Sequence, residues 1–274
     1  MTADDDAAMA LGRAAHAKLK HGFEIRDHLR DLLANLGNVE RPLRREDNAR
    51  SRSRKVQAQW VLEAVPDYTE AALLMGDFIH NLRAAMDYAV WAVTPQEVRE
   101  ATPTKVAFPL YSKPGSWTCW SKDRKNWYGP TVFKVLEGYQ PFNAGDGQLH
   151  PLHILQFLSN TDKHQLLNIV ATSQVDMGAL KVVPEPPGGV KSWVNKEVVE
   201  AGSVLARVEF MRPDEPDSVT LQLIFAYKQV FRYVDQNGDE HWLTVGDAMN
   251  AIGPQVVEAV GCVLSAHVKD SKDE

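Results

Sequence analysis

Five charged or imidazole side chains in two short segments are the residues best suited to chemistry in this chain. GDFIHNLRAAMDYAVW holds His80, Arg83 and Asp87, and LSNTDKHQLLN holds Asp162 and His164. A guanidinium can clamp an anion with two parallel hydrogen bonds, and a histidine can carry a proton near neutral pH. If the two segments converge, these candidate catalytic residues would form a site for an anionic substrate or ligand, such as RNA or a nucleotide.

Other polar residues beside them are candidates for ligand binding. Asn81 and Tyr88 flank Arg83 on the first segment, and Asn160 precedes Asp162 on the second. Together with Arg83 they form the predicted binding set. At about 100° per residue, the polar residues of the first segment share one helical face.

A purely structural interpretation competes with this site. Arg83 and Asp87 are four residues apart and can pair along a helix, and no Lys or Glu occurs between residues 71 and 95. This predicts a helix covered on both faces, whose ion pair fixes packing. Asp162 would then cap a helix, with His164 on its solvated side. Because no complete catalytic set can be assembled, we favour a non-catalytic binding or assembly protein, with an enzyme as the alternative.

Two weaker patterns accompany these segments. SWTCWSKDRKNWYGP interleaves tryptophans with basic residues, as single-stranded nucleic acid requires, but tryptophans three residues apart more often belong to a core. His150, His153 and His164 could suggest a metal, but the spacing identifies no complete ligand set. We therefore expect neither a metal nor a cofactor.

Periodicity predicts the elements that position these residues. Helical spacing appears at 4–36, in a long apolar segment at 69–94, at 116–123, 131–138, 152–158 and 163–171, and at 246–268, where Gly253-Pro254 restarts the helix. Alternation at 55–65 predicts a strand. Residues from about 178 to 244 favour an antiparallel sheet with a hairpin at Asn237-Gly238, and Thr244 with Asp247 suits a helix cap.

These elements predict an α+β fold with a core resembling a helical bundle. We expect one domain over residues 1–274, with a helical part at 1–172 plus 246–268 and a β-rich part at 173–244. The 44% hydrophobic content of the 274 residues is sufficient for a substantial core.

Charge and composition narrow the partners. A net charge of -6 argues against coating nucleic acid by bulk charge, but a local basic loop remains a possible nucleic-acid contact. Its cations are Arg41, Arg44, Arg45, Arg50, Arg52, Arg54 and Lys55. Cys119 and Cys262 are expected to be buried thiols, and the N-terminus lacks a secretory pattern. We expect a cytoplasmic protein without a membrane span, for which a homo-oligomer is possible.

The two segments also carry a resemblance. The HNLR-x-x-x-D pattern followed by DKH resembles a group of uncharacterised bacterial and phage-associated proteins. The first segment is more weakly similar to a helix of HEPN domains, whose signature implies an arginine followed four to six residues later by a histidine. Arg83 would be that arginine. Tyr88, Ala89 and Val90 occupy the later positions, so the implied catalytic histidine is missing, and the resemblance implies a HEPN-like helical core without a complete ribonuclease motif.

Overall fold

The chain folds into two compact units. The computed structural model describes residues 12–39, 41–145, 149–213 and 220–273. The helical unit contains the chain up to Asp31, Glu70–Asn168 and the chain from Arg232 onward, and the sandwich unit contains Leu32–Thr69 and Ile169–Phe231. The expected α+β class is confirmed. The β-rich part also takes in residues 32–69, whereas 232–244 belong to the helical unit.

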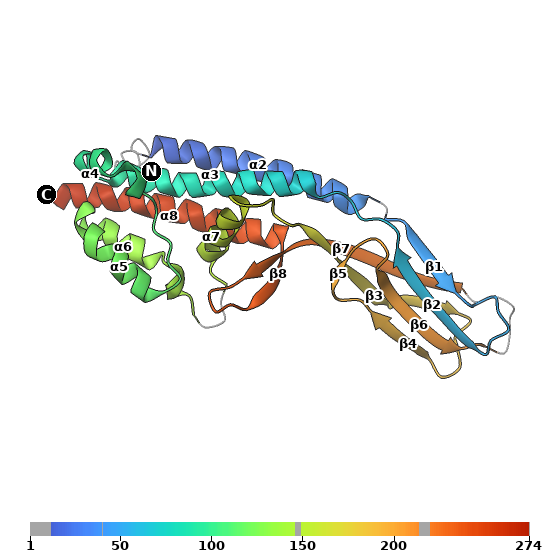
Figure 1. The fold of residues 1–274 in the computed structure, drawn as a ribbon. Helices are drawn as coiled ribbons and strands as arrows, with labels where there is room; N and C mark the ends of the chain where they lie inside the picture. The colour runs from blue at the N-terminus through green and yellow to red at the C-terminus, as the bar shows by residue number, and fades with distance from the viewer. Residues whose placement is uncertain (1–11, 40, 146–148, 214–219, 274) are drawn as a thin grey trace. The chain divides into compact units, whose positions relative to one another are not determined.

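Most helices belong to the helical unit (Figure 1). Its long helices are α2 (Arg13–Asn38, of which the part up to Asp31 lies in this unit), α3 (Thr69–Val93) and α8 (Val245–Asp273). The shorter ones are α4 (Gln96–Ala101), η1 (Pro103–Lys105), α5 (Pro114–Arg124), η2 (Lys125–Trp127), α6 (Pro130–Gly138), η3 (Pro141–Asn143) and α7 (Pro151–Asp162). The helices predicted near 116–123 and 131–138 are thereby confirmed as α5 and α6. The start of the predicted helix at 4–36 lies outside the described residues.

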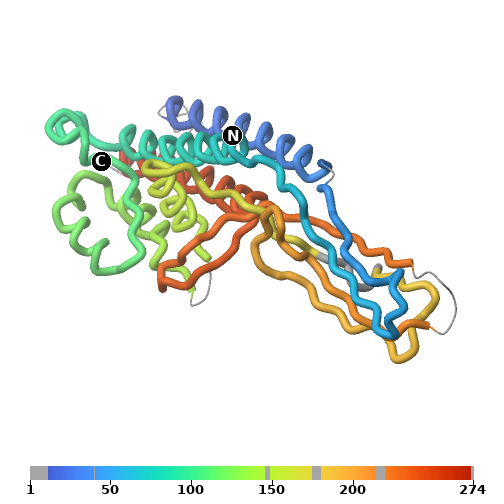
Figure 2. Tube along the Cα trace, turned by 45° about the vertical axis from the view of Figure 1, so that its right-hand side comes forward, coloured from blue at the N-terminus to red at the C-terminus, as the bar shows by residue number. Residues whose placement is uncertain are grey.

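The predicted central helix is confirmed as α3, which begins where Asp67 accepts the backbone N–H of Thr69 at 2.9 Å and ends before Pro95. It runs beside α2 in both views (Figures 1 and 2). One face is buried, including Phe78 and Leu82. The expectation that both faces are covered is wrong, because Leu73, His80 and Tyr88 are exposed. The missing Lys and Glu therefore do not indicate burial.

α8 forms much of the remaining helical core. It packs against α6 and α7, and the predicted cap is present, since the Asp247 N–H donates to Thr244 Oγ1 at 3.0 Å. The predicted restart at Gly253-Pro254 is wrong, because the helix passes through Pro254 without a break. By length and composition alone, the stretch Val245–Lys272 could cross a membrane.

The end of α7 differs from the prediction. The polar run from Ser159 to Asp162 was expected to break the helix, but it forms the last turn of α7. Thr161 Oγ1 donates back to the Phe157 carbonyl at 3.0 Å, so a polar side chain is accommodated within the helix. Asp162 is therefore not the cap of a second helix. The helix predicted at 163–171 is absent, and a strand begins at Val170.

Two antiparallel sheets complete the fold. One has the order β1-β2-β6-β4 and the other β5-β3-β7-β8. The strands are β1 (Leu43–Asp47), β2 (Lys55–Leu62), β3 (Val170–Val183), β4 (Val190–Val194), β5 (Val198–Val199), β6 (Val204–Met211), β7 (Thr220–Val234) and β8 (Glu240–Thr244). The strand predicted at 55–65 is confirmed as β2. The segment expected to be a basic loop begins with β1, and the Asn237-Gly238 hairpin joins β7 to β8, with Gly238 at φ 92°.

The core of the sandwich unit lies between the two sheets. Val56, Ala58 and Trp60 alternate along β2 and point into a cluster with Phe210 and Leu221. Gln57 and Gln59, which lie between these residues in β2, point to the opposite side of the sheet. The alternation read from the sequence therefore fixes which face of β2 is buried and which is outside.

A cationic pocket in the helical unit

The Arg83–Asp87 pair of α3 binds the backbone N–H and C=O of one neighbouring residue, Phe108. The expected pair is present, with Arg83 Nη2 at 3.1 Å from Asp87 Oδ1. Arg83 Nη2 also donates to the Phe108 carbonyl at 2.7 Å, and the Phe108 N–H donates to Asp87 Oδ1 at 2.8 Å. Both side chains are partly exposed, at 21% for Arg83 and 32% for Asp87. The pair therefore anchors an extended segment to α3.

Two glutamines hold the rest of this extended segment, residues 106–111, which we call the strap. Gln140 Nε2 donates to the Pro109 carbonyl and its Oε1 accepts the Tyr111 N–H, both at 2.9 Å. Gln156 Nε2, from α7, donates to the Leu110 carbonyl at 2.9 Å. Backbone groups that no strand partner satisfies are thus satisfied by side chains, and the strap is fixed in place.

The strap forms one wall of a pocket of about 320 Å³. Four cationic residues line it: Arg83, Lys105, Arg124 and Lys163. The other lining residues are Ala107, Phe108, Pro109, Leu110, Tyr111, Trp120, Gln156, Ser159 and Asn160. Within the described part of the chain, no carboxylate lines the pocket. This excess of positive charge makes it suited to an anion.

The cations differ in how they are held. Arg124 lies over the rings of Trp120 and Trp127, with its central carbon 5.7 and 5.3 Å from their centres. Its Nε is buried and has no hydrogen-bond partner among the described residues. Lys105 and Lys163 are exposed. The guanidinium of Arg124 is therefore positioned by stacking and by the hydrogen bond that its Nη1 donates to the Trp120 carbonyl at 3.4 Å, whereas the exposed lysines can move toward a ligand.

Burial and charge act against each other around the pocket. Burial raises the pKa of Asp87, although Arg83, the Phe108 N–H and Lys163 each lower it. Burial likewise raises the pKa of Tyr111, against the opposing effect of Arg124 and Arg83. The positive charges therefore influence Tyr111 from within the pocket, and its hydroxyl remains a neutral donor at physiological pH.

Only part of the predicted site converges. Of the candidate residues, Arg83 and Asn160 line the pocket. Asp162 instead lies against Gly76 of α3, with its pKa raised by burial and by Asp77 and lowered by His80. The end of α7 thus lies against α3 near Asp77 and His80, outside the pocket.

The remaining candidates have other environments. His164 is exposed and does not line the pocket. Asn81 is buried, accepts a hydrogen bond from Lys18 Nζ at 3.1 Å and donates to the Asp77 carbonyl at 2.8 Å. Tyr88 is 44% exposed on α3. The proposed five-residue catalytic set is therefore not assembled around the pocket.

Several of the pocket residues were not connected with Arg83 from the sequence. Lys105, Arg124 and Lys163 lie in three separate segments, and no spacing rule connects them. In the tryptophan segment, Trp117, Trp120 and Tyr128 are core residues, as the sequence favoured. Trp120 also lines the pocket, so this segment contributes to the site as well. Cys119 is exposed, contrary to expectation, and Cys262 is partly buried.

The histidines do not form a metal cluster in the described ranges. Burial lowers the pKa of both His150 and His153. His150 Nδ1 accepts the Leu152 N–H at 3.2 Å at the start of α7, and His153 Nδ1 is hydrogen-bonded to the Tyr233 hydroxyl. These contacts give both side chains structural roles.

Most cations of the predicted basic loop have partners within the sandwich unit. Arg41 is buried against Tyr68 and Tyr227, with its Nη2 3.2 Å from the Tyr68 hydroxyl. Salt bridges pair Arg44 with Glu46, Arg45 with Asp47, and Lys55 with Glu209. Arg50, Arg52 and Arg54 are exposed. Four of the seven cations thus have a partner within this unit.

Comparison of the chain with protein-family models finds no match. Neither the curated proteins nor the solved structures contain a match. The pocket's own chemistry is therefore the basis for assigning it a function.

Proposed function

We propose that the protein is a non-catalytic binding protein for a small phosphorylated ligand, held in the pocket of the helical unit. The observation that carries this proposal is the set of four cations in a lining that, among the described residues, includes no carboxylate, with Arg83 alone paired to Asp87 at its edge. Charge-assisted hydrogen bonds from guanidinium and ammonium groups are the strong contacts of phosphate recognition.

The size and walls of the pocket favour a nucleotide-sized ligand. A volume of about 320 Å³ is near the lower end of the range for small-molecule sites, roughly 300–1,000 Å³. Tyr111 and Trp120 add aromatic surface beside the cations, and Asn160 adds an amide that can donate and accept. A phosphate joined to a planar group would use both parts of this wall.

A catalytic role has less support. In the described part of the chain the pocket lining includes no histidine, and Asp87 accepts a hydrogen bond from the strap. The resemblance to HEPN domains also stays a proposal. Arg83 lines the pocket, but Tyr88 is five residues further along α3, roughly 140° away around the helix, and does not line it.

The test is calorimetric titration with inorganic phosphate, pyrophosphate, AMP and ADP. We expect at least one to bind, and Lys163→Glu to weaken it by about tenfold or more, since one charged contact contributes roughly 1.5–3 kcal/mol. Lys134→Glu makes the same change of charge at an exposed residue of α6 that does not line the pocket, and should leave affinity nearly unchanged.

Two results would contradict the proposal. One is that none of the four probes binds at low salt, where electrostatic attraction is strongest. The other is that Lys163→Glu and Lys134→Glu weaken binding equally, which would mean that the anion responds to net charge and not to the pocket.

A further inference from the structure

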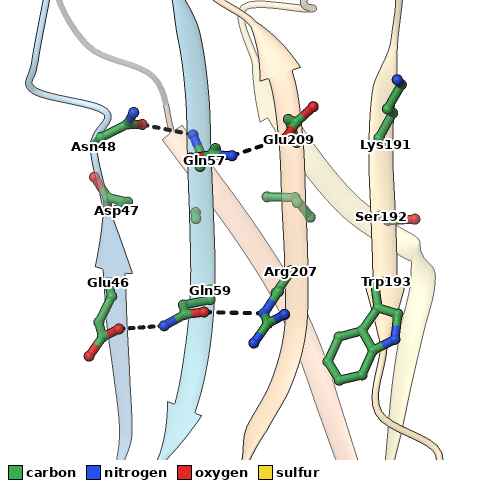
Figure 3. Close-up of a pocket in the computed structure, with 12 residues that line it drawn as sticks. Glu46, Asp47, Asn48, Gln57, Gln59, Lys191, Ser192, Trp193, Arg207 and Glu209 are labelled. Carbon is green, nitrogen blue, oxygen red and sulfur yellow. Dashed lines mark hydrogen bonds between the residues drawn. The ribbon is translucent and has the colours of Figure 1, made fainter. Parts of the chain in front are cut away.

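The outer face of the β1-β2-β6-β4 sheet carries a second cavity, an open trough of about 620 Å³ within the sandwich unit. The register of the strands places two rows of side chains on this face. Gln57 pairs with Glu209 and then Lys191 across the strands, and this forms one row of outward side chains. The second row crosses the same strands two residues away and consists of Glu46, Gln59, Arg207 and Trp193. Figure 3 shows both rows.

The floor of the trough is backbone. Between the rows, Ala58 is paired with Val208, and Val208 with Ser192. Ala58 and Val208 belong to the buried core cluster, so their side chains leave the outer face free. Four strands about 4.8 Å apart give the trough a length of about 14 Å across the sheet. It is therefore long and shallow, with polar rims.

Hydrogen bonds hold these rims in position. Gln59 Nε2 donates to Glu46 Oε2, while Gln59 Oε1 accepts from Arg207 Nε at 3.3 Å. In the other row, Gln57 Nε2 donates to Glu209 Oε2 at 3.0 Å. These contacts appear as dashed lines in Figure 3. Each amide and carboxylate retains further donor or acceptor capacity, so the groups are oriented without being saturated.

An exposed tryptophan closes one end of the second row. Trp193 is 48% exposed, and the central carbon of Arg207 lies 5.3 Å from the centre of its ring. This cation–π contact steadies the indole and covers one of its faces. About half of the indole remains exposed, so a ligand in the trough can pack on it.

We infer that this trough binds a neutral oligosaccharide. Sugar hydroxyls both donate and accept, as do the amides of Gln57 and Gln59, and sugar C–H groups carry the partial positive charge that the face of an indole attracts. Three carboxylates and two cations line the trough, so its charge is nearly balanced. That balance does not favour a polyanion, whose binding depends on excess cations.

A bound peptide strand fits the trough less well. Peptides that extend a sheet use the unpaired backbone of an edge strand, whereas the trough lies across the face of four paired strands. Its floor also lacks apolar pockets for peptide side chains, because Ala58 and Val208 point into the core. This inference does not depend on the function proposed for the helical unit.

The experiment is calorimetric titration of the full chain with cellotetraose, maltotetraose, mannotetraose and N-acetylchitotetraose. We expect at least one to bind at millimolar concentration or below. Trp193→Ala should weaken that binding by about tenfold or more, which corresponds to roughly 1.4 kcal/mol. Gln59→Ala should weaken it as well. Trp242→Ala is the matched control, because Trp242 is 49% exposed on β8 and does not line the trough.

Each contrary outcome is decisive once circular dichroism shows that the variants are folded. Absence of binding by all four tetrasaccharides at millimolar concentration would overturn the inference. So would binding that Trp193→Ala leaves unchanged, or that Trp242→Ala weakens to the same degree, because the sugar would then lie elsewhere.

Discussion

At the scale of single residues, the surroundings of Asp87 have opposing effects on its charged form: burial destabilises it, while Arg83 and the Phe108 N–H stabilise it. Asp87 accepts the Phe108 N–H and pairs with Arg83, yet its pKa is raised because burial outweighs those contacts. A raised pKa means that the native state holds the proton more tightly than the unfolded chain does. The charge of Asp87 therefore opposes folding, while its hydrogen bonds favour it.

This conflict predicts a pH dependence. The stability contributed by Asp87 should be fully present below its ordinary pKa of 3.8 and should decline as pH rises to the raised native value. Asp87→Asn keeps an acceptor for Phe108 and removes the titration. The free energy of unfolding of the wild type, minus that of Asp87→Asn, should fall as the pH of urea titrations is raised above 3.8. A difference that rises would mean that Arg83 dominates.

Asp87→Ala provides the control for the hydrogen bonds. It leaves the Phe108 N–H without its acceptor and Arg83 without its pair, so it should cost about 1–3 kcal/mol at neutral pH, more than Asp87→Asn costs.

Arg83 is also the best measure of what the sequence could predict about the site. Its type and its spacing from Asp87 predicted a buried ion pair; the pair is present, but both side chains are partly exposed. Lys105, Arg124 and Lys163 join it only because the strap, α5 and α7 meet around one pocket. Such convergence depends on tertiary packing, which local spacing does not encode. His80, in contrast, has the right residue type but lies on an exposed part of α3.

At the scale of elements, helix prediction succeeded where apolar periodicity was strong and failed where polar side chains could bond locally. α3 was identified from its long apolar sequence. β1 was missed because Arg44 and Arg45 mask a strand whose backbone pairs with β2. The polar end of α7 stays helical where Asp162 packs against Gly76.

The contact between α3 and α7 predicts an unusual response to alanine. Gly76→Ala raises helix propensity, which alone would stabilise α3 by about 1 kcal/mol. A Cβ at this position would, however, overlap the Asp162 carboxylate. We expect a net loss of stability by thermal or urea denaturation, and recovery in the double variant Gly76→Ala with Asp162→Ala.

Gly261→Ala in α8 is the matched control for that substitution. It adds the same methyl group to a helix where nothing lies within 4 Å, so it should stabilise by about 0.5–1 kcal/mol. A stabilising Gly76→Ala would show that Asp162 moves aside easily and does not hold the two helices together.

At the scale of the whole molecule, the two units carry cavities that differ in charge. The helical unit has a pocket with four cations, and the sandwich unit has a trough of nearly balanced charge. Residues lining each of these sites belong to one unit only. The two proposed ligands therefore differ in chemistry and use separate parts of the chain.

Hydrogen exchange should separate the two sites. The phosphorylated probe should slow exchange in residues 106–111 and 156–163, and the tetrasaccharide should slow it in residues 46–59 and 190–209. Each ligand should leave the other set unchanged. Protection of both sets by a single ligand would contradict independent sites and would show a coupling free energy between them.

The first turn of α6 carries a consequence for biosynthesis. Its Thr131 and Val132 N–H groups donate to the Asp270 carboxylate, both at 3.0 Å, although Asp270 follows Thr131 by 139 residues. On the ribosome, α6 emerges long before the residue that caps it. All strands of the sandwich unit, which ends at Phe231, are also translated before Asp270. Vectorial synthesis therefore allows the sandwich to form early, while α6 acquires its cap only when the end of α8 has left the exit tunnel.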